Sequence, residues 1–282
     1  GIISEYNPFH RGHAWQLGEL RRRLGAETAV VCAMSGSFVQ RGDFAVMRTH
    51  ARAEAAVRGG ADLVLELPLP WAIASAEGFA AGGVGVLAAT GAVDTLVFGS
   101  ECGDTETLKA VAAALESESF AAYLRQGLQE GVSFAAAREA AARKLLGERA
   151  AVLAQPNDIL GVEYCKAILE LAPAMTPVPL PRQGADHGQE LAPDAVRFAS
   201  ASALRKLWQT GGADAVAPYV PEAVLPFYRE AFAAGQYTDF DAEGRCELAL
   251  LRSRCVGQMP FAAVRGVSEG LEHRLERAVR AS

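Results

Sequence analysis

Short apolar runs alternate with helical stripes through the first hundred residues of this chain. The runs are rich in valine, isoleucine and leucine, which is typical of strands buried on both faces of a parallel sheet. The segments between them repeat apolar residues at helical spacing. This alternation predicts an α/β fold, namely a Rossmann-like, doubly wound parallel sheet with right-handed crossovers. The expected strands are residues 2–3, 28–33, 62–67 and 94–98, and the expected helices are residues 14–24, 49–58 and 71–89.

The composition is that of an ordinary soluble protein. Half of the 282 residues are hydrophobic, and 27 basic against 33 acidic side chains give a net charge of −6. The chain as a whole is therefore not typical of nucleic-acid binding, although a local basic patch stays possible. Five scattered cysteines without a CxxC pair indicate reduced thiols in the cytoplasm. We expect no secretory signal and no membrane span, since Glu77 and several glycines interrupt the most apolar stretch, Trp71–Thr90.

The pattern changes after the fourth expected strand. Residues 104–146 are alanine-rich and helical, and Met175–Leu180 reads as a further strand near a sheet edge. Beyond Pro218 the pattern is helical and poorer in glycine. We therefore expect a catalytic domain over residues 1–215 and a mostly helical C-terminal module over residues 216–282, which we expect to be incomplete here.

Two histidines follow the first strand where a helix is expected to begin. His10 and His13 flank Gly12, and a helix N-terminus offers unpaired N–H groups and a positive dipole. Strand, glycine turn and paired imidazoles together indicate a phosphate site, whose histidines would donate to phosphate oxygens during an in-line displacement. The alternatives are structural histidines and a zinc site, which the lack of a nearby carboxylate or cysteine at ligand spacing disfavours.

Polar residues also follow two other strands. The residues that directly follow a strand form its exit. Because ligands of a doubly wound sheet bind outside the carboxyl ends of the strands, the strand exits are expected to meet at one edge of the sheet, where a ligand can bind. After the fourth strand, Gly99 permits close approach of a nucleotide. The loop after the second strand suits a small anionic substrate. The alternative for this loop is a surface loop in which Arg41 forms an ion pair. The residues of that loop are Ser35, Gly36, Gln40 and Arg41.

A second anion cradle is indicated at Ser200–Arg205. Small residues at a helix start, followed by the forked guanidinium of Arg205, suit a triphosphate, although Ser200 or Ser202 can be only a helix cap. Asn157 or Asp158 is expected to be the N-cap of a helix that begins here, and the alternative for Asn157 is a contact with ribose or adenine. Arg182 is either a solvated charge or a ligand. Residues 21–23, three arginines in a row, form a solvated helix face or contact an RNA backbone.

These stretches together resemble the tRNA(Met) cytidine acetate ligase family, a group within the HIGH-type nucleotidyltransferases. His10–His13 is similar to the HxGH signature, and Ser200–Arg205 to the second motif of the superfamily, with Ala201 in place of a hydroxyl residue. Asp158 stands where the family commonly has asparagine. The stretches that carry the resemblance are Glu5–His13, Met34–Gly42, Asp62–Pro68, Phe98–Glu101, Gln155–Gly161, Ser200–Lys206 and Glu269–Arg274.

The resemblance implies a HIGH nucleotidyltransferase fold and a two-step reaction. ATP and acetate would give acetyl-adenylate and pyrophosphate, and the acetyl group would pass to N4 of the wobble cytidine of elongator tRNA(Met), forming N4-acetylcytidine. Mg²⁺ is expected with ATP, without an identified site. The implied catalytic residues are His10, His13 and Arg205. The implied ATP site comprises Ile2, Ile3, Ser4, Glu5, Tyr6, Asn7, Pro8, Phe9, His10, Arg11, Gly12, His13, Ala14, Trp15, Gly99, Asn157, Arg182, Ser200 and Ser202, and the acetate site Ser35, Gly36, Gln40 and Arg41.

Two other functions remain open from the sequence. One is a nucleotidyltransferase that adenylylates a phosphorylated metabolite. Such an enzyme would need a second basic pocket for the phosphate of its substrate, and only Arg41 and Arg48 are expected near the edge of the sheet where ligands bind. The other is a nucleotide-binding RNA or ribosome accessory protein without chemistry. The sequence gives no indication of an oligomeric state.

Overall fold

The computed structural model describes residues 1–181, 199–256, 261–264, 267 and 270–281, with only the backbone of Arg41, Ala135, Cys255 and Val256. The chain divides into two compact units, Gly1–Tyr237 and Thr238–Ser282. The second unit contains α11 (Phe240–Val256), the single turn η4 (Phe261–Ala263) and α12 (Leu271–Ala281). The functional residues predicted above all belong to the first unit.

The first unit is built on parallel strands. β2 (Val31–Ser35) lies between β1 (Ile2–Ser4) and β3 (Leu63–Leu67), and β4 (Thr95–Ser100) pairs with β5 (Thr176–Pro181). The N–H of Val97 donates to the carbonyl of Gly1 over 2.9 Å, which joins the two groups of strands. The resulting order β3-β2-β1-β4-β5 is the doubly wound arrangement, and the predicted fold class is confirmed.

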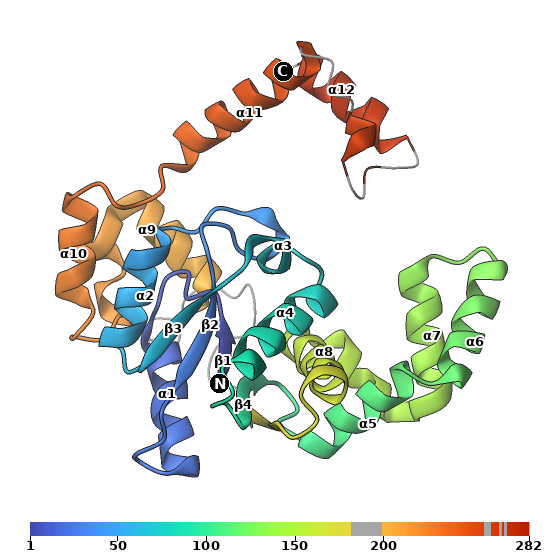
Figure 1. Ribbon diagram of the computed structural model, residues 1–282. Helices are drawn as coiled ribbons and strands as arrows, with labels where there is room; N and C mark the ends of the chain where they lie inside the picture. The colour runs from blue at the N-terminus through green and yellow to red at the C-terminus, as the bar shows by residue number, and fades with distance from the viewer. Residues whose placement is uncertain (182–198, 257–260, 265–266, 268–269, 282) are drawn as a thin grey trace. The chain divides into compact units, whose positions relative to one another are not determined.

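Helices cover both sides of these strands. Figure 1 shows β1–β3 between α1 and α2 on one side and α4 and α8 on the other. The main hydrophobic core lies between the strands and α4, α5 and α8. The helices of this unit are α1 (Arg11–Leu24), η1 (Gln40–Gly42), α2 (Thr49–Arg58), α3 (Leu69–Ala72), α4 (Ala76–Ala89), α5 (Thr105–Leu115), α6 (Glu118–Gln129), α7 (Phe134–Leu146), η2 (Gly147–Ala154), α8 (Pro156–Leu171), α9 (Ala201–Ala215), η3 (Ala217–Tyr219) and α10 (Leu225–Ala233).

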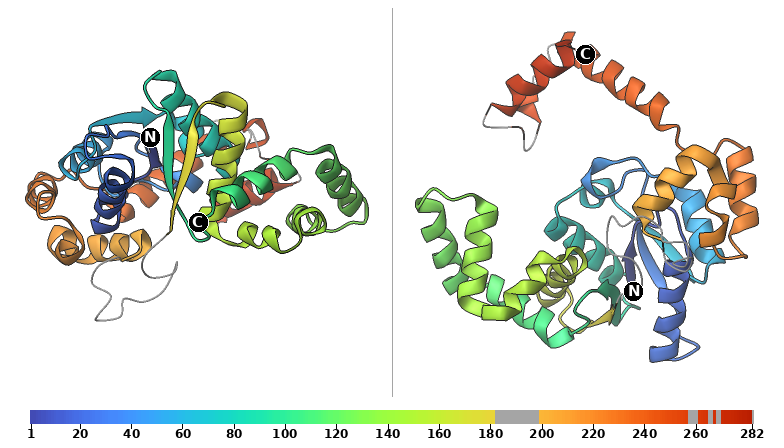
Figure 2. Two further views of the ribbon diagram at one scale, coloured as in Figure 1. Left: turned by 90° about the horizontal axis from the view of Figure 1, so that it is seen from below. Right: turned by 180° about the vertical axis from the view of Figure 1, so that it is seen from behind.

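The apolar stretch Trp71–Thr90, expected to hold one helix over residues 71–89, is divided between the end of α3 and the whole of α4. Among the described residues, no helix combines the length and the apolar character that crossing a membrane requires. Burial of the strands on both faces is wrong for β3, because Leu63 is 46% exposed and Glu66 is exposed as well. Figure 2 shows from below and from behind how α6 and α7 extend away from the strands as a hairpin.

Two predicted helix starts are wrong. α1 begins at Arg11, three residues before the expected position, because the side chain of His10 caps it. Neither Asn157 nor Asp158 is the N-cap of α8. That helix begins at Pro156, which is a favoured first residue because its missing N–H would lack a helical partner in any case. The cap predicted at Ser200 is confirmed, since its hydroxyl accepts from the N–H of Ala203.

Residues 216–237 pack with the first unit. The hydroxyl of Tyr228, on α10, donates to the carbonyl of Phe9 over 3.1 Å, and Tyr237 forms a β-bridge with Met47. The boundary between compact units therefore falls at Tyr237, later in the chain than the expected domain boundary at residue 215. The assignment of catalysis to residues 1–215 stays a prediction.

Candidate functional site

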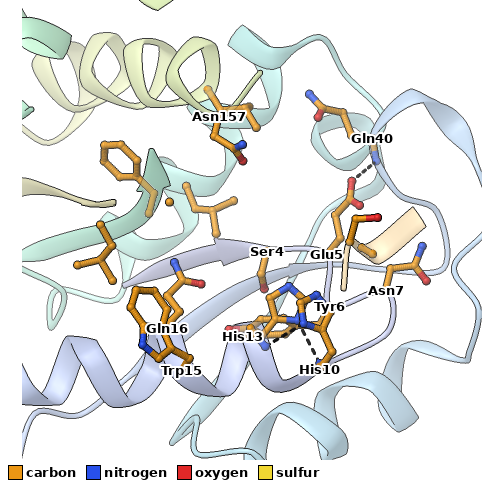
Figure 3. Close-up of a pocket in the computed structure, with 18 of the residues that line it drawn as sticks. Ser4, Glu5, Tyr6, Asn7, His10, His13, Trp15, Gln16, Gln40 and Asn157 are labelled. Atoms are coloured by element: carbon orange, nitrogen blue, oxygen red, sulfur yellow. Dashed lines mark hydrogen bonds between the residues drawn. The ribbon is translucent and has the colours of Figure 1, made fainter. Parts of the chain in front are cut away.

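A cavity of about 350 Å³ opens at the carboxyl ends of β1 and β4. This is the point where the strand order reverses, so it is the place where a doubly wound sheet binds its ligands. Polar side chains from the β1 exit, α1 and α8 surround it, as Figure 3 shows. Phe79, Phe98, Leu160 and Tyr164 supply an apolar wall. The cavity therefore offers both a polar and an apolar side to one ligand.

The two histidines cap α1 and lie against each other. Nδ1 of His10 accepts from the N–H of Gly12 over 3.0 Å, and Nδ1 of His13 accepts from the N–H of His10 over 3.3 Å. Their ring centroids are 3.8 Å apart. Because both Nδ1 atoms are acceptors, the proton of each neutral ring is assigned to Nε2. The capping arrangement thus makes both Nε2 atoms hydrogen-bond donors at a cavity wall.

The start of α9 forms another part of the same cavity. Ser200, its N-cap, and Ala201 line the cavity, and the hydroxyls of Ser200 and Ser202 lie 3.1 Å apart. Arg205 donates from Nη1 to the carbonyl of Asn7 over 3.3 Å, which ties α9 to the turn before α1. Two helix N-termini, those of α1 and α9, therefore reach one cavity, and a helix N-terminus favours an anion.

The exit of β4 is held to the start of α8 by two carboxylates. Glu101 accepts from the side-chain amide of Asn157 and from the N–H of Asp158. The buried carboxylate of Asp158 accepts in return from the Ser100 hydroxyl and from the N–H groups of Glu101 and Cys102. These reciprocal bonds position Gly99 and Asn157, which both line the cavity.

Replacing Asp158 by alanine is expected to lower the free energy of unfolding by about 2–4 kcal/mol, since donors to a buried carboxylate lose their acceptor. Asp158→Asn keeps one acceptor oxygen at the same place and is expected to cost less than half of that. Urea unfolding measures the free energy of unfolding of both variants. Equal stability of the two variants would contradict this role.

The exit of β2 is organised around a buried arginine. Arg52, on α2, donates to the carbonyls of Glu5, Ser35, Gly36 and Met47. Burial lowers the pKa of this guanidinium to about 10, so it stays charged at neutral pH. Arg52 thereby holds the exits of β1 and β2 together, beside the cavity.

This geometry separates the four residues predicted to hold acetate. Gln40 lines the cavity, and its N–H donates to Glu5 over 3.0 Å. Ser35 and Gly36 do not line it. Ser35 is fully buried, and a Cβ on Gly36 would meet Oε1 of Glu66 at 2.2 Å. The side chain of Arg41 lies outside the described residues.

The predicted ATP residues divide in the same way. Arg182 lies outside the described residues, and Ile2 and Phe9 are buried in the core. Arg11 and Ser202 are exposed, and they lie, with Pro8 and Ala14, outside the cavity lining. The predicted residues that do line the cavity are Ile3, Ser4, Glu5, Tyr6, Asn7, His10, Gly12, His13, Trp15, Gly99, Asn157 and Ser200.

The arginines at residues 21–23 pair within the chain. Arg21 contacts Asp62 and the carbonyl of Gly60, whereas Arg22 and Arg23 both pair with Glu19. This favours the solvated helix face over an RNA contact.

Several cavity residues were not predicted. Gln16 lies one turn after His13, and Leu160 and Tyr164 lie one and two turns after Asn157. Helical spacing from the predicted residues is a signal that could have found them. Arg52 gave no such signal, because an arginine in a helix is usually solvated.

The arrangement suits transfer at a nucleotide phosphate. Paired imidazole donors and two helix N-termini can stabilise negative charge that develops on phosphate oxygens, and the apolar wall can receive a flat base. In the described part of the chain, no group of three or more His, Cys, Asp or Glu side chains is placed to hold a metal ion. The four cysteines described there are free thiols.

Comparisons with known proteins agree with this geometry. The family model described as HIGH Nucleotidyl Transferase matches residues 1–282. The tRNA(Met) cytidine acetate ligase of Acetivibrio thermocellus is 38% identical over 99% of this chain and 68% of its own length. That of Halothermothrix orenii is 37% identical over 100% of this chain and 69% of its own length. The crystal structure of Thermotoga maritima TmcAL bound with alpha-thio ATP superposes with a TM-score of 0.86 at 34% identity, over 100% of this chain and 67% of that one.

Proposed function

The chain belongs to the HIGH nucleotidyl transferases and, within them, to the tRNA(Met) cytidine acetate ligases, and from this membership we propose its reaction. It is an ATP-dependent ligase that activates acetate as acetyl-adenylate and transfers the acetyl group to N4 of the wobble cytidine of elongator tRNA(Met). The observation that carries the proposal is one cavity that joins the His10–His13 pair to the N-terminus of α9.

In the first step, a carboxylate oxygen of acetate attacks the α-phosphorus of ATP, and pyrophosphate leaves. His10 and His13 donate from Nε2 to phosphate oxygens as negative charge grows there. Ser200 and the amides at the start of α9 hold the departing pyrophosphate. Arg205 keeps these two parts of the site in register through its bond to Asn7, besides contributing positive charge near the phosphates.

The substrates occupy opposite ends of the cavity in this proposal. The adenosine lies against Gly99 and Asn157, beside the apolar wall, at the point where a doubly wound sheet binds its ligands. Acetate lies toward Gln40, at the exit of β2. Mg²⁺ enters with the ATP phosphates, which are its usual ligands in such sites.

The compartment follows from the substrates. ATP and tRNA are both available in the cytoplasm, and the free thiols of the described cysteines suit its reducing conditions. We therefore place the reaction there.

The proposal predicts that labelled acetate enters elongator tRNA(Met) only when ATP is present. The product, identified by nucleoside mass spectrometry, is N4-acetylcytidine at the wobble position. A matched transcript with uridine at that position is expected to stay unlabelled, because it lacks the N4 amine. Labelling of the uridine transcript, or none of the native one, would sink the acceptor assignment.

A further inference from the structure

In the proposed first step, one carboxylate of the cavity lining makes or breaks no bond and transfers no proton. Glu5 follows β1 directly, lines the cavity and is half-buried. Figure 3 shows its carboxylate beside Gln40, with Asn157 farther away. It therefore lies at the end assigned to acetate rather than at the end assigned to adenosine.

The carboxylate of Glu5 is only partly used by the fold. Oε1 accepts from the N–H of Gln40 over 3.0 Å, whereas Oε2 accepts no hydrogen bond from the described residues. Burial raises the pKa of this carboxyl. The Gln40 N–H, Arg205 and Arg52 oppose that shift, and Asp43 adds to it. A carboxylate that is more basic than usual is suited to accept a proton.

The transfer step needs such a proton acceptor. The N4 amine of cytosine is conjugated with the ring and is a weak nucleophile. When its nitrogen bonds to the acetyl carbon, the bond from that carbon to the AMP oxygen breaks, and AMP leaves as a phosphate monoester anion. The amine must lose one proton for the neutral amide to form. The activation of acetate, in contrast, releases no proton from either reactant.

Resting on the function proposed above, we propose that Glu5 is the general base of the transfer step and that its Oε2 takes the proton from N4 of the cytidine. Its bond from Gln40 fixes the carboxylate at the acetate end of the cavity. Glu5 is therefore needed for acetyl transfer and dispensable for acetate activation.

Glu5→Gln separates the two steps. The amide oxygen of glutamine can still accept from the Gln40 N–H, so the local structure is kept while the base is lost. We expect acetate-dependent exchange of pyrophosphate into ATP to stay within about threefold of the wild-type rate, and transfer to tRNA(Met) to fall by about 100-fold or more. Hydroxylamine is nucleophilic without a base, so trapping of the acetyl group by it is expected to persist.

Glu66→Gln is the matched control. Glu66 is exposed, lies outside the cavity lining and, like Glu5, acts electrostatically on Arg52. We expect it to leave both steps unchanged. If Glu5→Gln does not fold, Glu5→Asp serves instead, because it keeps a carboxylate but withdraws it from N4. That variant is expected to keep exchange and to lose about tenfold in transfer.

These assays distinguish the failure of this inference from failure of the proposed function. Glu5→Gln with wild-type transfer, or with exchange and transfer reduced equally, would overturn the role of Glu5 while acetate activation stood. Wild-type protein without acetate-dependent exchange would overturn the proposed function itself.

Discussion

Replacing His13 by alanine is expected to lower the rate of acetate-dependent pyrophosphate release by about 100- to 1,000-fold, which is the usual effect of removing one donor to a developing charge. The rate is measured at saturating ATP and acetate, without tRNA. The loss is expected in kcat rather than in the KM for ATP, because the donor acts most strongly on the charge of the transition state.

The capping role of His13 provides the control. Nδ1 of His13 accepts from the N–H of His10, so alanine also removes part of the cap of α1, at about 1 kcal/mol. Asparagine places an oxygen near the position of Nδ1 and keeps the cap without the Nε2 donor. Glutamine places its amide nitrogen near Nε2. We therefore expect His13→Asn to be folded and inactive, and His13→Gln to be the more active of the two. An active asparagine variant would contradict the assignment.

Replacing Arg52 by methionine is expected to lower the free energy of unfolding by about 3–5 kcal/mol. Arg52 is fully buried and donates to four carbonyls at the exits of β1 and β2 and the start of α2. Each buried acceptor that loses its donor costs about 1–3 kcal/mol, part of which local movement recovers. Urea unfolding followed by circular dichroism measures the loss.

Lysine and a neighbouring arginine are the controls for Arg52. Arg52→Lys keeps the charge but cannot reach four carbonyls with one ammonium group, so an intermediate loss is expected. Arg58 lies on the same helix, pairs with Glu54 at the surface and packs on Phe227. Arg58→Met is expected to cost at most about 1 kcal/mol. If Arg52→Met were as stable as Arg58→Met, Arg52 would not organise the strand exits.

The strand exits could be predicted from the sequence because their position depends on a repeated pattern. Buried runs alternate with amphipathic helices, and this alternation alone brings Glu5–His13 and Gly99 to one edge. The bond between Arg205 and Asn7 brings the Ser200 segment, far along the chain, to the same edge, which the alternation alone does not predict. The alternation of strands and helices predicts which strand ends lie together. It does not predict which side chains at each strand end face the cavity.

Tertiary contacts decided what the sequence did not indicate. The start of α1 and the cap of α8 differ from the predictions because histidine is an uncommon cap and because Pro156 occupies the first position of α8. Ser35 is predicted to hold acetate, but it is fully buried and its carbonyl accepts a hydrogen bond from Arg52. Whether a loop residue contacts a ligand or is buried depends on which side of the loop packs against the protein. Loops have no regular repeat of apolar residues from which this could be predicted.

Exchange of labelled pyrophosphate into ATP, without tRNA and with acetate varied, tests the central claim most directly. A ligase that forms acetyl-adenylate at the His10–His13 site must run this step backward as well as forward. We predict exchange that saturates with acetate and is absent without it. Exchange that ignores acetate, or no exchange by folded protein that binds ATP, would contradict acetate activation at this site.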